Sequence, residues 1–131
     1  MPHFTFEYSA NLEGRVDLDR LCVAIRDTAL STGLFELGAV RVRGSRCDHY
    51  CVADNLSENA FLDLSVRIGV GRSAAQKKAI GDALSAMLEE ELSDLFDTPH
   101  FALSIEVREI DPDLSWKRNA IHPRIRAMEN K

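Results

Sequence analysis

Residues 62–76 read LDLSVRIGVGRSAAQ, and this stretch joins two structural elements. Apolar residues alternate with polar ones as far as the first glycine, which is the pattern of a β-strand with one buried face. Gly69 and Gly71 interrupt that pattern, and the spacing of Ser73 and Gln76 is that of a capping box, which opens a helix. The stretch therefore predicts a strand, a glycine turn and a helix, the first two elements of a βαβ unit.

The sequence after this stretch completes the unit. Apolar residues recur at helical spacing over 80–96, and Pro99 then separates the helix from the next element. Residues 101–108 alternate between apolar and polar, which predicts a last long strand. From about residue 111 the pattern is lost, and we expect an irregular tail.

The sequence before this stretch has the same order of elements. Residues 3–8 alternate strictly as a strand. A helix is predicted over 17–33, because its first residue is an aspartate, a good N-cap, and its last is a glycine, a natural stop. A second alternating strand follows over 39–43. We expect a turn at 44–48 and a short returning strand at 50–52.

Strand, helix and strand thus occur twice, which predicts an α/β (α+β) fold of tandem βαβ units. We expect a single domain over residues 1–131, and its second half begins at about residue 61. Right-handed crossovers place both helices on one face of a four-stranded sheet. The other face has no covering element. It is expected to carry Tyr8, Phe61 and Ala102, which suggests oligomerisation.

Charge and composition exclude several classes of partner. The net charge of −5 argues against nucleic acid and against an anionic membrane. An anionic small molecule remains possible. Salt screens charges over a Debye length of roughly 8 Å, so that arginines close to the ligand outweigh carboxylates farther away. The sequence has no apolar window of the roughly 20 residues needed to span a bilayer, and we see no export signal. Its three cysteines fit free thiols, so we expect a cytoplasmic protein.

Pro2 is the most informative position for chemistry. Removal of Met1, which a small following residue permits, would leave a secondary amine at the head of a strand. A generic α-amino group has a pKa of about 7.7–8, and burial or nearby arginines would lower it towards the value that suits a general base. Met-Pro is also a common start without any function, but the strand begins at once and holds the terminus within the fold.

Three arginines could bind an anion. Arg72 lies between a strand and a helix N-terminus, where it could hold a carboxylate through two hydrogen bonds, or simply face solvent in the turn. Arg41 and Arg43 share one face of a strand, where an anion, a salt bridge or plain exposure would relieve their repulsion. His3, next to Pro2, is a further candidate acid, base or ligand contact, although simple exposure beside the first strand is the favoured interpretation.

A metal site is not expected. Cys47, His49 and Cys51 could supply three ligands, but their spacing matches no standard zinc pattern and no clear fourth ligand follows. His100 and His122 are expected at the surface.

The sequence resembles the 5-carboxymethyl-2-hydroxymuconate isomerases of the tautomerase superfamily, bacterial enzymes of homoprotocatechuate breakdown. The specific features are the start Met1-Pro2-His3-Phe4 and the junction Ile68-Gly69-Val70-Gly71-Arg72-Ser73. The supporting ones are Thr32-Gly33-Leu34-Phe35, Val40-Arg41-Val42-Arg43, Ala53-Asp54, Leu103-Ser104-Ile105-Glu106, Trp116-Lys117-Arg118-Asn119 and His122. From Pro123 onward we find no match.

The resemblance implies a tautomerase-like fold, a homotrimer with its sheets facing inward, and a reaction without metal or organic cofactor. It implies that Pro2 shuttles a proton and that Arg72 and Arg41 bind carboxylates and polarise the 2-oxygen of an unsaturated hydroxy or keto acid. Arg43 and His3 are expected as further substrate-binding residues. Two alternatives stay open: another proline-dependent reaction (a different tautomerase, a dehalogenase or a decarboxylase), and a non-catalytic module for metabolite binding or assembly.

Overall fold

A computed structural model describes residues 1–130 and contains one four-stranded sheet. The strands are β1 (His3–Ser9), β2 (Arg41–Cys47), β3 (Ala60–Gly69) and β4 (Phe101–Ile110), in the spatial order β2-β1-β3-β4. The pairs β1–β2 and β3–β4 are parallel, and the central pair β1–β3 is antiparallel. These are two βαβ units in one four-stranded sheet, as the sequence predicts, and the structure shows that they meet along their first strands.

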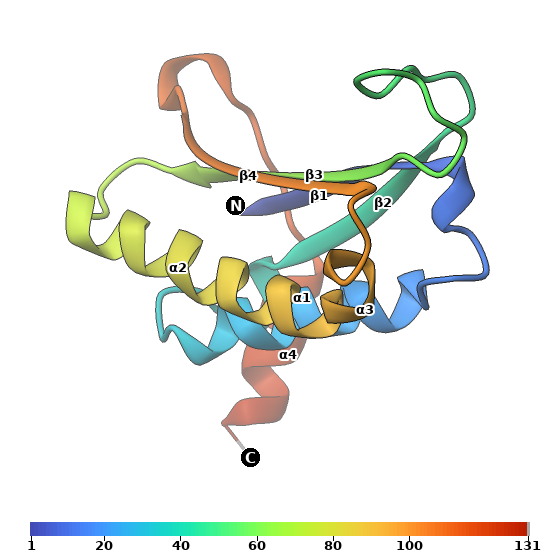
Figure 1. Cartoon of the computed structure of the whole chain (residues 1–131). Helices are drawn as coiled ribbons and strands as arrows, with labels where there is room; N and C mark the ends of the chain where they lie inside the picture. The colour runs from blue at the N-terminus through green and yellow to red at the C-terminus, as the bar shows by residue number, and fades with distance from the viewer. Residues whose placement is uncertain (131) are drawn as a thin grey trace.

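Two long helices cover one face of the sheet. Figure 1 shows α1 and α2 side by side beneath the strands, with the opposite face uncovered. Asp17 caps α1 by accepting a hydrogen bond from the Arg20 amide, and the capping box of Ser73 and Gln76 opens α2. The helices are α1 (Leu18–Ser31), α2 (Ala74–Glu91), α3 (Ser93–Phe96) and α4 (Ile121–Glu129), with short 3-10 turns η1 (Ala10–Leu12), η2 (Leu37–Ala39) and η3 (Pro112–Leu114). No helix within residues 1–130 is long and apolar enough to cross a membrane.

The core lies between the sheet and these helices. Alternate residues of β1 and β3 face inward, so that Phe4 and Phe6 of β1 are fully buried in one cluster with Ile25 and Leu84 of the helices. The inward residues of β3 in this cluster are Leu62, Leu64, Val66 and Ile68. The packing is close beside β2, where a Cβ on Gly44 would lie 2.4 Å from the Phe6 ring. The ring of Phe6 thus occupies the space where β2 has no side chain.

Three local predictions for the first half are wrong. The expected turn at 44–48 is strand as far as Cys47, because β2 pairs with β1 along its whole length. Residues 50–52 form no strand and lie in a loop, where the Asn59 side chain donates to the Val52 carbonyl at 3.0 Å. Tyr8 is buried in the core rather than on the uncovered face, because it follows Phe6 in the strand alternation.

The C-terminal segment is more ordered than the sequence suggests. After β4 the chain turns above the sheet and descends past it to α4, on the same side as the other helices (Figure 1). The Asn119 side-chain oxygen accepts from the amides of Ile121 and His122 at 2.9 and 3.1 Å, which caps the first turn of α4. The expected irregular tail therefore contains a helix, and this helix packs on η2.

Candidate active site

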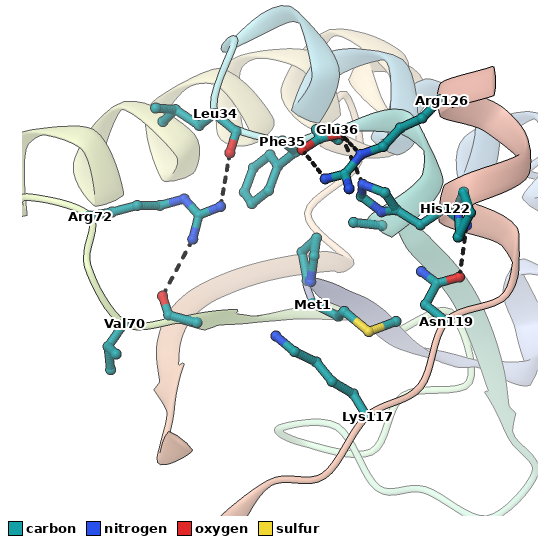
Figure 2. A pocket seen from close by; sticks show the side chains of 14 residues that line it. Met1, Leu34, Phe35, Glu36, Val70, Arg72, Lys117, Asn119, His122 and Arg126 are labelled. Carbon is teal, nitrogen blue, oxygen red and sulfur yellow. Dashed lines mark hydrogen bonds and ion pairs between the residues drawn. The ribbon is translucent and has the colours of Figure 1, made fainter. Parts of the chain in front are cut away.

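A cavity of about 610 Å³ opens beside the N-terminus. Four separate segments line it: the terminus, the connection from α1 to β2, the turn after β3, and the C-terminal segment. Figure 2 shows Arg72 on one wall, Lys117 on another, and His122 and Arg126 on the wall formed by α4. The cavity is therefore assembled from parts of the chain that are distant in sequence.

The Arg72 side chain is fixed in this cavity by neutral partners. Its backbone follows Gly71, whose φ of +115° favours glycine, and precedes the cap of α2. Its guanidinium donates to the Leu34 carbonyl at 2.8 Å and to the Gly69 carbonyl at 3.4 Å, and it lies over the Phe35 ring. No carboxylate within residues 1–130 forms an ion pair with it, so its charge is available to an anion.

The terminus lies in the same cavity. Pro2 is buried, because β1 begins at His3 and pairs with strands on both sides. Burial, then the charge and hydrogen bond of Lys117, then Arg41 and Arg72, lower the pKa of the Met1 amino group from 8.0 to about 6. An amine in this place is therefore largely unprotonated at neutral pH and can accept a proton.

A second cavity, of about 380 Å³, adjoins the first. Arg41 and His3 line it, together with residues 115–118 of the C-terminal segment. Four residues line both cavities, namely Met1, Gly69, Val70 and Lys117. The terminus thus stands between Arg72 on one side and Arg41 on the other.

Within the described residues 1–130, no carboxylate forms an ion pair with the arginines around His3. Arg41 Nη2 lies 3.2 Å from His3 Nε2, and Arg43 Nη1 lies 3.3 Å from His3 Nδ1. Burial, then Arg41, Arg43 and Arg67, lower the pKa of His3 to about 4, so the ring is neutral and has a single acceptor nitrogen. Only one of the two guanidinium groups can therefore donate to it. Arg41 Nε is also buried without a partner. An anion would satisfy these donors.

An acidic group holds α4 at the rim of the first cavity. Glu36 accepts from Arg126 through both carboxylate oxygens, at 2.8 and 2.9 Å, and its Oε2 lies 2.8 Å from His122 Nε2. These hydrogen bonds, that of Arg126 first, lower the pKa of Glu36 to about 2. His122, expected at the surface, instead has a side chain only 16% exposed and lines the cavity.

The structure divides the candidate residues between the two cavities. Pro2 and Arg72 share the first, whereas Arg41 and His3 lie in the second, and Arg43 lines neither but contacts His3. Within residues 1–130 no group of three or more His, Cys, Asp or Glu side chains is placed to hold a metal ion.

Sequence reasoning missed the contribution of the C-terminal segment. Among the sequence features, Lys117 and His122 count towards a function only as part of the family resemblance. The prolines and the absence of periodicity conceal the short helix that brings this segment to the cavity. Asn119 followed by helix-competent residues is the local signal that predicts where this helix starts.

This arrangement suits proton transfer on an anion. An amine with a lowered pKa can remove and return a proton, while guanidinium groups on either side stabilise negative charge that develops on a substrate oxygen. No step of this kind needs a redox centre.

Comparison with known proteins gives one consistent family. The 5-carboxymethyl-2-hydroxymuconate isomerase family matches residues 2–125. The 5-carboxymethyl-2-hydroxymuconate Delta-isomerase of Escherichia coli is 32% identical over 122 residues, which are 93% of this chain and 97% of that protein.

Solved structures agree with this match. A 5-carboxymethyl-2-hydroxymuconate isomerase from Deinococcus radiodurans R1 superposes with a TM-score of 0.88 at 35% identity, over 95% of this chain and 93% of that one. A fused 4-OT, described as a symmetric trimer, superposes with a TM-score of 0.56 at 12% identity, over 88% and 93% of the two chains. The second likeness shows the shared fold alone.

Proposed function

Because this chain belongs to the 5-carboxymethyl-2-hydroxymuconate isomerase family and is an isomerase of that family, we propose that it ketonises 5-carboxymethyl-2-hydroxymuconate, or a similar unsaturated hydroxy acid, through Pro2. The observation that carries the proposal is the position of the terminus between two cavities, each with an arginine free of any ion pair within residues 1–130. Removal of Met1, which lines both cavities, would join them into one cleft and expose the Pro2 nitrogen there.

The reaction moves one proton and is redox-neutral. The Pro2 nitrogen takes the proton of the 2-hydroxyl group, a C=O bond forms at that carbon, and the conjugated double bonds shift by one position. The carbon at the far end of the shifted system then takes a proton from the same nitrogen, which regenerates the free amine.

The arginines supply the electrostatics. Arg72 and Arg41, on opposite sides of the terminus, would bind substrate carboxylates and stabilise the negative charge that develops on the 2-oxygen. Arg43 and His3 would support the binding of a carboxylate at Arg41, in the second cavity. Arg41 and Arg72 also lower the pKa of the Met1 amino group, and we expect them to lower that of the Pro2 amine, so that substrate binding and base strength depend on the same groups.

The setting of the enzyme is part of the proposal. We place it in the cytoplasm, in the breakdown of aromatic compounds by way of homoprotocatechuate. We also propose a homotrimer, because one face of the sheet has no covering element and a superposable relative is described as a symmetric trimer. Multi-angle light scattering at micromolar concentration should give three times the chain mass of 14.6 kDa.

The decisive experiment is an ultraviolet assay of dienol ketonisation on protein whose N-terminus has been verified by mass spectrometry. We expect turnover only from chains that begin at Pro2. A preparation that retains Met1 should be inactive, because its Pro2 nitrogen is then an amide without a basic lone pair. Equal activity in the two preparations would contradict the proposed base. Profiling of halogenated and decarboxylatable acids separates this reaction from those of other proline-dependent enzymes.

A further inference from the structure

The imidazole of His122 is held on the wall of the first cavity by three separate contacts. Its backbone amide donates to the Asn119 side chain at 3.1 Å, which places it in the first turn of α4. A Cβ on Gly38 would lie 2.8 Å from the His122 Cα and 3.3 Å from its Cγ, so the close approach of the two segments depends on this glycine. Nε2 lies 2.8 Å from Glu36 Oε2, and Figure 2 shows the ring reaching from α4 towards Glu36, above Met1. The ring is therefore positioned before any ligand arrives.

The bond to Glu36 determines which ring nitrogen carries the proton. The hydrogen bonds of Arg126 and then of His122 lower the pKa of the Glu36 carboxyl to about 2, so this group is ionised at neutral pH and can only accept hydrogen bonds. Nε2 of His122 must therefore be the donor. In the neutral imidazole the other nitrogen, Nδ1, is then an acceptor with a free lone pair. A carboxylate that fixes the tautomer of a histidine in this way also makes the other nitrogen a better acceptor.

Nδ1 of His122 is accessible but has no hydrogen-bond partner within residues 1–130. In that part of the chain the imidazole bonds through Nε2 alone. Arg41 Nε is the one buried side-chain nitrogen or oxygen without a partner among the described residues, so Nδ1 is not sealed inside the fold. The His122 side chain is largely buried and lines the first cavity together with Pro2. An acceptor without a donor therefore shares this cavity with the terminal proline.

Pro2 can supply the donor once Met1 has been removed. While Met1 is attached, the Pro2 nitrogen is an amide that carries no hydrogen. The free secondary amine has one N–H group besides the lone pair that acts as base, and it has two N–H groups after it has taken a proton. These groups need an acceptor, whereas the side chains whose charges act on the terminus, those of Lys117, Arg41 and Arg72, are all donors.

We propose that Nδ1 of His122 accepts a hydrogen bond from the Pro2 N–H group of the chain without Met1, so that Glu36, His122 and Pro2 form a chain of hydrogen bonds that positions the base. The inference rests on the proposed function and deepens it, because it assigns a positioning residue to that reaction. The hydrogen bond turns the lone pair of the amine towards the substrate. It also stabilises the ammonium group that forms when Pro2 takes the proton, against repulsion by the surrounding cations. A carboxylate–histidine pair orients a catalytic group in the same way in hydrolases.

Two substitutions separate the roles of the two ring nitrogens. His122→Gln places an amide group near the position of Nε2, so that it can still donate to Glu36, and removes the acceptor at Nδ1. His122→Asn places a carbonyl oxygen near the position of Nδ1 and loses the bond to Glu36. The charged groups beside the ring, Glu36 and Arg126, stay in both variants. His49→Gln is the matched control, because His49 is exposed in the loop after β2 and lines neither cavity.

The readouts are kcat, KM and the pH profile of ketonisation on protein without Met1, with thermal melting of each variant. We expect His122→Gln to lower kcat by about 10-fold at nearly unchanged KM, the effect of losing one hydrogen bond to a charged group. The acid limb of kcat/KM should move to lower pH, because the ammonium group loses its acceptor while the surrounding cations still repel it. His122→Asn should keep the acid limb of wild type, and His49→Gln should behave as wild type. A higher KM in His122→Gln with an unmoved acid limb would show that His122 only holds the cavity wall, and would overturn the inference.

Nuclear magnetic resonance tests the hydrogen bond without turnover. Wild-type protein with a verified Pro2 terminus that ketonises no substrate would refute the proposed function, but the bond could still be measured in it. With isotope-labelled proline, titration gives the pKa of the Pro2 amine, which should be lower in His122→Gln than in wild type. With isotope-labelled histidine, the Nδ1 resonance of His122 should shift when Met1 is removed, and this comparison needs no variant. An equal pKa of Pro2 in the two proteins, or an Nδ1 resonance that is the same with and without Met1, would overturn the inference.

Discussion

The guanidinium carbon of Arg72 lies 4.6 Å from the centroid of the Phe35 ring, in cation–π contact. Phe35 itself packs edge-on against the buried Phe4 of β1, with ring centroids 5.6 Å apart. The core therefore determines where the ring lies, and the ring determines where the guanidinium lies. The ring orients the guanidinium of Arg72 and leaves its positive charge in place, whereas a carboxylate partner would neutralise that charge.

Arg72→Ala should weaken substrate binding and transition-state stabilisation without unfolding the protein. We expect kcat/KM to fall by the equivalent of about 1.5–3 kcal/mol, the value of a hydrogen bond to a charged group. Arg72→Lys should recover part of this loss, because it keeps the charge but lacks the planar donor pair. Steady-state kinetics with circular dichroism as the folding control would check this, and an unchanged kcat/KM in Arg72→Ala would remove Arg72 from the site.

Pro2→Ala should keep the fold and lose most of the turnover. The variant still has an amine once Met1 is removed, but a primary one with a different pKa and a less constrained position. Since positioned acid–base catalysis contributes about 10²–10⁴-fold, we expect kcat to fall by about 10²-fold or more. The ultraviolet assay measures this, with mass spectrometry to confirm removal of Met1. Turnover equal to that of wild type would refute the assignment of the base.

The pH dependence of kcat/KM should report the pKa of the N-terminal amine. Burial and the surrounding cations destabilise the protonated form, which lowers the pKa of the Met1 amino group to about 6. We expect the same cations to lower the pKa of the Pro2 amine once Met1 is removed, because Pro2 is buried and lines the same cavity. The base is therefore expected to be unprotonated at neutral pH, and activity should be lost on the acid side of neutrality. Lys117→Gln should move this acid limb to higher pH. An acid limb at the ordinary value, about 8, would contradict the electrostatic account of the cavity.

Glu36→Gln should loosen the wall formed by α4. Glu36 loses its charge-assisted bonds to Arg126 and His122, so we expect faster hydrogen exchange over residues 116–129 and a higher KM. The folded-state pKa of Glu36 is lowered to about 2, below an unfolded value of about 4.3. The contribution of Glu36 to the free energy of unfolding is therefore fully present above about pH 4.3 and is lost as the pH falls through about 2. Glu90→Gln, an exposed change of the same charge on α2, is the control, and equal exchange in the two variants would contradict the prediction.

Gly44→Ala should destabilise the fold, whereas Gly81→Ala should not. The new Cβ at position 44 would lie 2.4 Å from the Phe6 ring, so the core must shift at a cost of about 1–3 kcal/mol, as is usual for overpacking. At position 81, within α2, the nearest atom is 3.7 Å away, and alanine is the better helix former by up to about 1 kcal/mol. Urea denaturation of both variants measures the difference, and equal midpoints would show that the packing beside β2 is looser than described.

Much of the fold can be predicted from the sequence, because its signals are local. Alternation gives β1, β3 and β4, and the capping residues Asp17 and Ser73 give the starts of both long helices. The end of β2 could not be predicted in this way. Gly44 is typical of a turn by local preference, but strand pairing with β1 and the space taken by Phe6 keep it within the strand.

By itself the sequence determined the order of the four strands and the two long helices, the two-layer architecture, and the presence of Pro2, Arg72 and Arg41 at strand ends and turns, since periodicity and capping act over a few residues. Only the tertiary structure decided that Arg72 and Arg41 lie in separate cavities on either side of the terminus, and that Lys117 joins them. The physical reason is that contacts such as that between Asn119 and Gly38, 81 residues apart, leave no periodic trace in either segment. They form only when the chain after β4 returns past the sheet to pack on η2.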